Sequence, residues 1–193
     1  MQPLILGSSS PYRSELLTKL QLPFTTASPS IDESPLIGES PAQLVLRLAE
    51  NKARKVAESN LSALVIGADQ VAVLDGEVLG KPGTIDNAVR QLQAASGKTV
   101  TFLTGLALYN AAIQQMQSVV EPFEVSFRHL SAAQIRRYVA MEQPLDCAGS
   151  FKSEGLGISL FNELRGSDPN SLIGLPLIRL IDMLAAQGVN VLG

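Results

Sequence analysis

The stretch Leu4-Ile5-Leu6-Gly7-Ser8-Ser9-Ser10-Pro11-Tyr12-Arg13, continued by SELLTKL at residues 14–20, decides the expected fold. An apolar run of strand length leads through three hydroxyl residues into a segment with helical apolar spacing. Ser10 suits the N-cap, and Pro11 suits the first helical position, where a missing N–H costs nothing. The first N–H groups of a helix carry partial positive charge, so this geometry is typical of a phosphate site. A capped helix with a surface arginine is the alternative interpretation.

Strand-like and helix-like segments alternate along the rest of the chain. We expect strands at residues 24–27, 64–68, 71–74, 77–79, 100–109 and 119–127, and helices at 41–59, 85–95, 132–141 and 176–187. Capping boxes begin at Ser40 and Ser131, and Asp75-Gly76 suits a tight hairpin turn. The alternation predicts an α/β class: an elongated, two-lobed mixed β-sheet flanked by helices, in a single domain over residues 1–193.

Composition excludes several function classes. The chain is 46% hydrophobic and 17% charged with a formal net charge of −3, which argues against a nucleic-acid binder. The single cysteine, Cys147, and the single histidine, His129, exclude an internal disulfide and a cysteine- or histidine-rich metal site. A bound metal would therefore have oxygen ligands, which Mg²⁺ and Mn²⁺ prefer. The chain shows neither a signal-peptide pattern nor an 18-residue apolar run, so we expect a cytoplasmic protein without membrane contact.

Two acids are candidates for the chemistry. Asp69 follows Gly67-Ala68 at an expected strand end, and a buried carboxylate is costly unless it is paired or bound to a metal. Asp69 is therefore either a turn residue or a functional acid. Glu33 lies in the polar loop after the second strand and is either an ordinary loop acid or a second metal ligand beside Asp69. Three lysines are candidates for phosphate binding or are plain surface residues: Lys52, Lys81 and Lys152.

Seven short motifs occur in a fixed order over nearly the whole chain. They are Ser8-Ser9-Ser10-Pro11-Tyr12-Arg13, Lys52-Ala53, Gly67-Ala68-Asp69-Gln70, Gly80-Lys81-Pro82, Thr104-Gly105, Ala148-Gly149-Ser150-Phe151 and Gly174-Leu175-Pro176-Leu177. This ordered set resembles the Maf family of nucleoside triphosphate pyrophosphatases. The resemblance implies a two-lobed, inosine-triphosphatase-like fold with a central cleft. It also implies hydrolysis of a nucleoside triphosphate to a monophosphate and pyrophosphate with a divalent metal.

The resemblance also implies roles for individual residues. Asp69 would be the general base, and Glu33 would join it in holding Mg²⁺ or Mn²⁺. The phosphates would be bound by Ser9, Arg13, Lys52 and Lys81.

Four positions depart from the thymidine- and uridine-triphosphate branch of that family and resemble the branch that hydrolyses 7-methyl-GTP. They are Tyr12, Gln70, Cys147 and Glu154, in place of arginine, threonine, lysine and glutamine. N7-methylation makes guanine cationic, so the aromatic face of Tyr12 would attract it. The Glu154 carboxylate would accept hydrogen bonds from the guanine N–H groups. Packing of Tyr12 against a lobe is the alternative.

We therefore expect a 7-methyl-GTP pyrophosphatase that removes modified nucleotides from the pool. A dTTP or UTP pyrophosphatase and a non-catalytic, nucleotide-binding regulator of cell division are the alternatives. The expected partners are the nucleoside triphosphate and, in a homodimer, a second copy of the chain.

Overall fold

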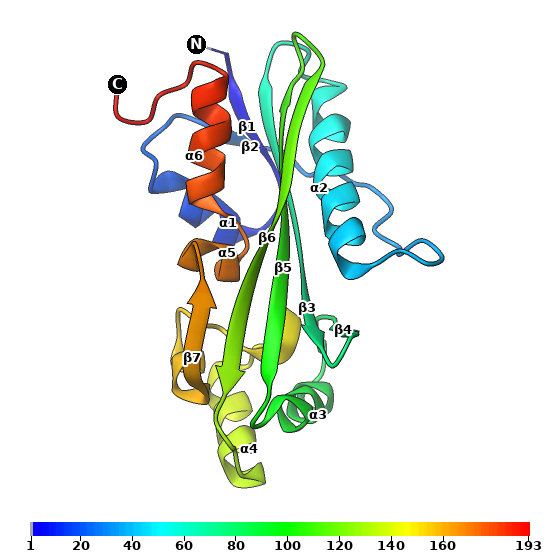
Figure 1. Ribbon diagram of the computed structural model, residues 1–193, viewed down its shortest axis with the longest axis vertical. Helices are drawn as coiled ribbons and strands as arrows, with labels where there is room; N and C mark the ends of the chain where they lie inside the picture. Colours follow the sequence, from blue (N-terminus) through cyan, green and yellow to red (C-terminus); the bar gives the residue numbers. More distant parts are fainter. Residues whose placement is uncertain (1) are drawn as a thin grey trace. The chain divides into compact units, whose positions relative to one another are not determined.

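A computed structural model describes residues 2–193, which form a seven-stranded mixed sheet flanked by helices (Figure 1). The elements are β1 (Leu4–Gly7), α1 (Pro11–Thr18), β2 (Thr25–Thr26), α2 (Pro41–Ala57), β3 (Leu64–Leu74), β4 (Glu77–Leu79), α3 (Ile85–Ala95), β5 (Thr99–Asn110), β6 (Gln115–Phe127), α4 (Ala132–Glu142), the 3₁₀ segments η1 (Ala148–Ser150) and η2 (Leu156–Leu160), β7 (Phe161–Gly166), α5 (Pro169–Ile173) and α6 (Leu177–Ala186). The strand order is β2-β1-β3-β5-β6-β7, and β4 pairs with β3. Among the described helices, none combines the length and the apolar character needed to cross a membrane.

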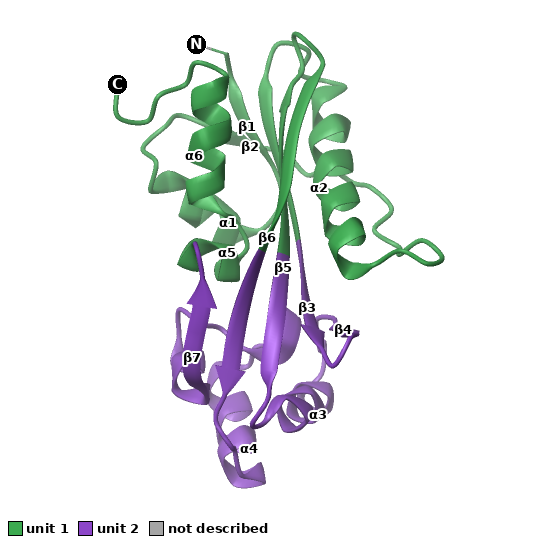
Figure 2. Ribbon diagram, in the orientation of Figure 1, with its two compact units in different colours: residues 1–69, 104–121, 168–193 green, residues 70–103, 122–167 purple. Residues whose placement is uncertain are grey.

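The chain divides into two compact units (Figure 2). Unit 1 contains residues 1–69, 104–121 and 168–193, and unit 2 contains residues 70–103 and 122–167. The strands β3, β5 and β6 each contribute residues to both units.

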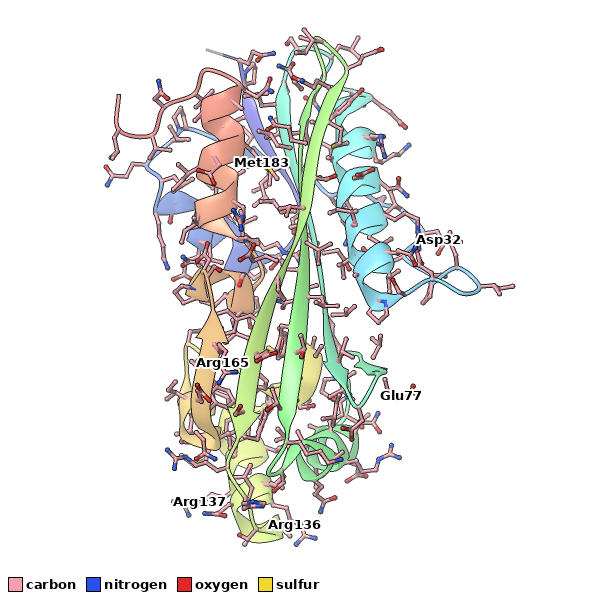
Figure 3. The ribbon with its side chains drawn as sticks, viewed as in Figure 1. Asp32, Glu77, Arg136, Arg137, Arg165 and Met183 are labelled. Carbon is pink, nitrogen blue, oxygen red and sulfur yellow. The ribbon has the colours of Figure 1, made fainter. Side chains whose placement is uncertain are left out.

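Unit 1 is built on parallel pairing around β1. β1 pairs in parallel with β2 on one side and with β3 on the other, with Leu4 opposite Leu64 and Gly7 opposite Gly67. Side chains alternate between the faces of a strand, so Leu4 and Leu6 join the core under α1 and α6, while Ile5 joins the core under α2. Figure 1 shows α1 and α6 on one face of these strands and α2 on the other. Met183, labelled in Figure 3, belongs to the α6 core.

Helix α2 lies so close to the sheet that two strand residues must be glycine. A Cβ added to Gly67 of β3 would overlap the backbone of Ala49, and one added to Gly105 of β5 would overlap the backbone of Val45. Val45 and Ala49 are one turn apart on the same face of α2. The helix is therefore fixed against β3 and β5 by backbone contact.

Unit 2 has an aromatic core. Phe151 makes edge-to-face contacts with Phe102, Phe127 and Phe161, with ring centroids 4.7–5.5 Å apart. The antiparallel pairs β3–β4 and β6–β7 lie in this unit, and α3 packs against α4. The turn before β4 uses Asp75 and Gly76 with φ of 51° and 87°, as the tight hairpin turn predicts.

The predicted α/β class and mixed sheet are confirmed, and so are the caps. Ser10 caps α1, and Ser40 and Ser131 form complete capping boxes at α2 and α4. One expectation was wrong. The expected strands at 64–68 and 71–74 are one strand, because β3 runs without interruption from Leu64 to Leu74, and Asp69 therefore lies inside a strand rather than at its end. Gly67, within that strand, is where α2 makes its close backbone contact.

Candidate functional site

The serine turn after β1 is held by its own hydroxyl groups. The Ser8 N–H donates to the Leu6 carbonyl at 2.9 Å, and the Ser10 N–H donates to Ser8 Oγ at 3.1 Å. Ser10 Oγ accepts from the Arg13 N–H at 3.4 Å, as expected of an N-cap. Ser9 is exposed at the tip of this turn. The turn therefore presents Ser9 on a preformed backbone.

Arg13 is fixed in place by two groups of unit 1. Its Nε donates to the Gly174 carbonyl at 2.9 Å, and its Nη1 donates to Ser8 Oγ at 3.4 Å. Burial lowers the pKa of the Arg13 guanidinium from its ordinary value, and the carboxylates of Asp69 and Glu33 oppose that shift. The guanidinium therefore lies within electrostatic reach of both predicted acids.

The centre of the site is an ion-pair triad of Glu33, Lys52 and Asp69. The Lys52 Nζ is 2.7 Å from Asp69 Oδ1 and 2.8 Å from Glu33 Oε1. Lys52 and Asp69 are buried, with 5% and 8% of their surface exposed, whereas 57% of the Glu33 side chain is exposed. Two carboxylates thus converge on one ammonium group at the edge of the core.

Strand pairing explains the position of Asp69. The register of β3 with β1 ends at Gly67, and its register with β4 begins at Ala72, so Asp69 lies between the two pairings. By strand alternation Asp69 shares a face with Val65 and Gly67, and this is the face covered by α2. Lys52 comes from α2, which brings its ammonium group to the carboxylate.

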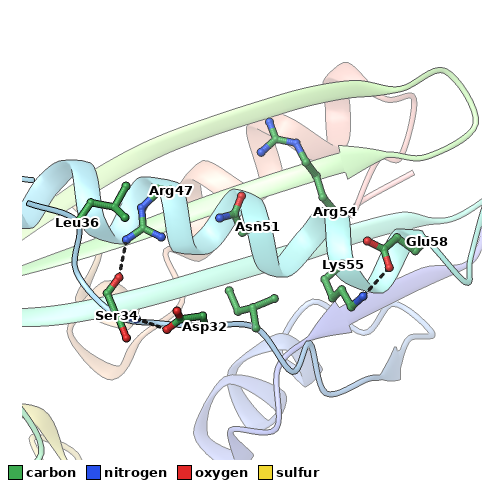
Figure 4. Close-up of a pocket in the computed structure, with 9 residues that line it drawn as sticks. Asp32, Ser34, Leu36, Arg47, Asn51, Arg54, Lys55 and Glu58 are labelled. Atoms are coloured by element: carbon green, nitrogen blue, oxygen red, sulfur yellow. Dashed lines mark hydrogen bonds and ion pairs between the residues drawn. The ribbon is translucent and has the colours of Figure 1, made fainter.

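The loop that carries Glu33 is tied to α2 by Arg47. The Arg47 guanidinium donates to both carboxylate oxygens of Glu39, at 2.5 and 2.7 Å, and to the Ser34 carbonyl at 3.1 Å. The hydrogen bond from Arg47 lowers the pKa of Glu39 to about 2. Beside this anchor, the loop and α2 enclose an open groove of about 440 Å³, shown in Figure 4 with Asp32 and Ser34 on its loop side. Glu33 therefore directly precedes a residue that Arg47 fixes to α2.

The donor set fits a hard divalent cation. Within residues 2–193, no group of three or more histidine, cysteine or acidic side chains is arranged to hold a metal. Glu33 and Asp69 nevertheless place oxygen atoms within 2.8 Å of one point, the Lys52 Nζ. Mg²⁺ is commonly bound through one or two carboxylates, with water and substrate phosphates completing the shell. Two carboxylates of the kind that Mg²⁺ prefers therefore lie together, with the Lys52 ammonium group at the point on which they converge.

The structure assembles part of the predicted residue set. Glu33, Lys52, Asp69 and Arg13 gather in unit 1, with Ser9 on the neighbouring turn. Tyr12 is half-buried on α1 and has interactions of its own. The other three predicted residues belong to unit 2: Gln70, Lys81 and Glu154. Of these, Lys81 and Glu154 are exposed. Their roles stay predictions.

Sequence reasoning missed three residues that support the site. Ser8 and Gly174 hold Arg13, and both lie in motifs quoted above without a role assigned to them. Asp168 is buried and accepts hydrogen bonds from the N–H groups of Asn170 and Ile178, which joins the starts of α5 and α6 on either side of Gly174. The Asp168-Pro169 pair is a helix-start signal that would have found it.

Comparison with known proteins points to one family. Residues 3–187 match the family described as Maf-like protein. A 7-methyl-GTP pyrophosphatase of Methylobacillus flagellatus is 62% identical over 192 residues, which cover 100% of both chains. A 7-methyl-GTP pyrophosphatase of Pseudomonas aeruginosa is 61% identical over 99% of this chain and 100% of that protein. The Ham1 protein of Staphylococcus aureus has a TM-score of 0.47 and 12% identity, over 66% of this chain and 73% of that chain, which is too low to support a conclusion. Since the family match spans residues 3–187, the chain belongs to the Maf family.

Proposed function

We propose that the protein hydrolyses 7-methyl-GTP to 7-methyl-GMP and pyrophosphate. The single observation that carries the proposal is the clustering of Arg13, Lys52, Asp69 and Glu33 beside the serine turn. Cations for a phosphate chain and a buried carboxylate for a water molecule are the groups that anhydride hydrolysis requires. Relatives about 60% identical over their full length are named for this substrate, which supports the same assignment here.

In the proposed reaction, Asp69 acts as general base. Lys52 holds one oxygen of Asp69, Oδ1, at 2.7 Å, so Oδ2 is the oxygen that takes the proton. Water attacks the α-phosphorus, its proton passes to Asp69, and the bond between the α-phosphorus and the bridging oxygen breaks. Pyrophosphate leaves with that oxygen. Products are the monophosphate and pyrophosphate, with one water consumed.

Positive charge from this chain stabilises the leaving group. Arg13 is fixed by Ser8 and Gly174, so its guanidinium needs little reordering to bind phosphate. Lys52 pairs with two acids here, and we propose that its ammonium group also binds the phosphates when the substrate is present. We propose that Ser9 donates a hydrogen bond to a phosphate oxygen from the turn. A divalent cation held by Glu33 and Asp69 would neutralise phosphate charge.

We propose that Tyr12, Gln70 and Glu154 together select the base, with the largest contributions from Tyr12 and Glu154. A cation–π contact is worth roughly 0.5–2 kcal/mol, and a hydrogen bond to a charged group is worth about 1.5–3 kcal/mol. Together these contacts would favour a methylated guanine over a neutral base on the order of tenfold to a thousandfold, at about 1.4 kcal/mol per factor of ten.

A substrate panel tests the proposal. The purified protein is given 7-methyl-GTP, GTP, dTTP and UTP in water enriched in oxygen-18, and kcat/KM is measured for each. We expect 7-methyl-GTP to be preferred and the label to appear in the monophosphate. A preference for dTTP or UTP would contradict the proposal and indicate a pyrimidine triphosphate pyrophosphatase. Binding of nucleotide without turnover would indicate a non-catalytic regulator. Label in orthophosphate would place the attack at the terminal phosphate.

A further inference from the structure

The short segment of unit 2 that carries Glu154 is held at its C-terminal end by α4. The Leu156 N–H, the first of the 3₁₀ segment η2, donates to Glu142 Oε2 at 2.8 Å. The contact is close: a Cβ added to Gly155 would lie 2.9 Å from both carboxylate oxygens of Glu142. The side chain of Glu142 thus closes the end of this segment and occupies the space beside Gly155.

The N-terminal end of the same segment is held by the same helix. The Lys152 N–H donates to the Tyr138 hydroxyl at 3.1 Å. Burial raises the pKa of the Tyr138 phenol above its ordinary value, so the hydroxyl stays protonated at neutral pH. The preceding residue, Phe151, is buried in the aromatic core of unit 2.

Glu154 projects from the span between these two anchors. It is exposed, and Ser153 Oγ lies 3.2 Å from its Oε2. Tyr138 and Glu142 are four residues apart, so they lie on the same face of α4, one turn from each other. That helix begins in a complete capping box and buries Ile135 and Val139. Both anchors therefore belong to one fixed element.

We infer that Tyr138 and Glu142 are positioning residues for base selection, because together they hold the segment from Lys152 to Leu156 in the shape that presents Glu154. The inference rests on the proposed function, in which Glu154 accepts hydrogen bonds from the base. A carboxylate gives directional hydrogen bonds only if its backbone is fixed. In the part of the chain that the structure describes, Tyr138 and Glu142 bond to the Lys152 and Leu156 amides, and the ion-pair triad is formed by Glu33, Lys52 and Asp69 alone. We therefore expect the two residues to act on substrate choice and not on the chemical step.

Two substitutions at Glu142 test the hydrogen bond against the charge. Glu142→Ala removes the acceptor for the Leu156 N–H, whereas Glu142→Gln keeps an acceptor oxygen and removes the charge. We expect Glu142→Ala to raise KM for 7-methyl-GTP about 3- to 10-fold, with kcat and the KM for dTTP unchanged. Glu142→Gln should resemble the wild type. Equal losses in both variants would overturn the inference, because the charge and not the hydrogen bond would then matter.

Two further variants test the anchoring of the same segment by different changes. Gly155→Ala brings a Cβ against the carboxylate of Glu142, and Tyr138→Phe removes the acceptor for the Lys152 N–H. Both should shift the ratio of kcat/KM between 7-methyl-GTP and dTTP in the same direction as Glu142→Ala. Arg137→Ala, an exposed change on α4 (Figure 3), is the control and should leave the ratio unchanged. A shift in the control as large as that in the variants would contradict the inference.

Amide hydrogen exchange separates this inference from the proposed function. In Glu142→Ala, the Leu156 amide should exchange faster while the amides of β1 keep their protection. If exchange at Leu156 does not change, the anchor does not exist and the inference fails, whatever the substrate is. If exchange rises but the substrate ratio stays constant, the anchor is structural only, and the inference also fails. A wild-type protein that does not prefer 7-methyl-GTP would refute the proposed function instead.

Discussion

Replacing Lys52 with methionine probes the buried triad directly. Lys52→Met keeps most of the length of the side chain and removes the ammonium group, which leaves the buried Asp69 carboxylate without the cation 2.7 Å from its Oδ1. Removing one partner of a buried ion pair costs about 3–5 kcal/mol. We expect a loss of stability near the lower end of this range. Arg13 remains within electrostatic reach of Asp69, and the Glu33 side chain, which is 57% exposed, keeps its contact with water. At roughly 2–4 °C per kcal/mol for a chain of this size, a loss of about 3 kcal/mol lowers Tm by about 6–12 °C.

The assay compares thermal and urea unfolding of Lys52→Met with those of Lys55→Met. Lys55 lies on the same helix and pairs with Glu58, but the two side chains are 47% and 62% exposed, so its loss should cost at most about 0.5 kcal/mol. Adding Asp69→Asn to Lys52→Met should recover part of the stability, since the isolated charge is removed. If Lys52→Met is as stable as Lys55→Met, the triad is solvated and the argument from burial is refuted.

Three further predictions concern the acids of the triad and Glu39, which Arg47 binds. Asp69→Asn should nearly abolish turnover and keep the fold, since it preserves size but removes the base; wild-type turnover in the purified variant would exclude that role. Activity should need Mg²⁺ or Mn²⁺ and disappear with EDTA, and Glu33→Gln should raise the metal concentration for half-maximal rate; an unchanged titration would remove Glu33 from the metal site. The pKa of Glu39, lowered from 4.5 to about 2 by Arg47, lies below its unfolded value, so its stabilisation is complete above pH 4.5 and is lost towards pH 2. The stability difference between wild type and Glu39→Gln should therefore shrink over that range of pH, and a difference independent of pH would contradict it.

Local signals in the sequence predicted the elements that depend on near neighbours. The caps at Ser40 and Ser131 and the hairpin at Asp75-Gly76 follow from residues within one turn of each other. β7 was missed, because only Phe161, its first residue, is buried and no apolar alternation marks it.

The site was predicted only in part, because its geometry is not local. The sequence placed Glu33 beside Asp69 as a candidate metal ligand and gave Lys52 as a separate candidate for phosphate binding. Their convergence depends on which face of β3 lies under α2 and on the Arg47 anchor of the Glu33 loop. A strand end was expected after Ala68 because the polar pair Asp69-Gln70 interrupts the apolar run, whereas β3 continues to Leu74. The contact of Gly67 with Ala49, 18 residues earlier, is not visible in the local pattern.

The backbone contacts of α2 at Gly67 and Gly105 also set how this protein tolerates mutation. A side chain at either position would lift α2 from the sheet, and α2 carries both Lys52, which pairs with Asp69, and Arg47, which anchors the Glu33 loop. A single methyl group there would disturb the triad and the loop together, although the atoms that it would meet first belong to the backbone of α2. In a library of random variants selected for activity, both positions should therefore stay glycine as strictly as the acids themselves, whereas exposed positions of the same helix, such as Lys55, should vary widely.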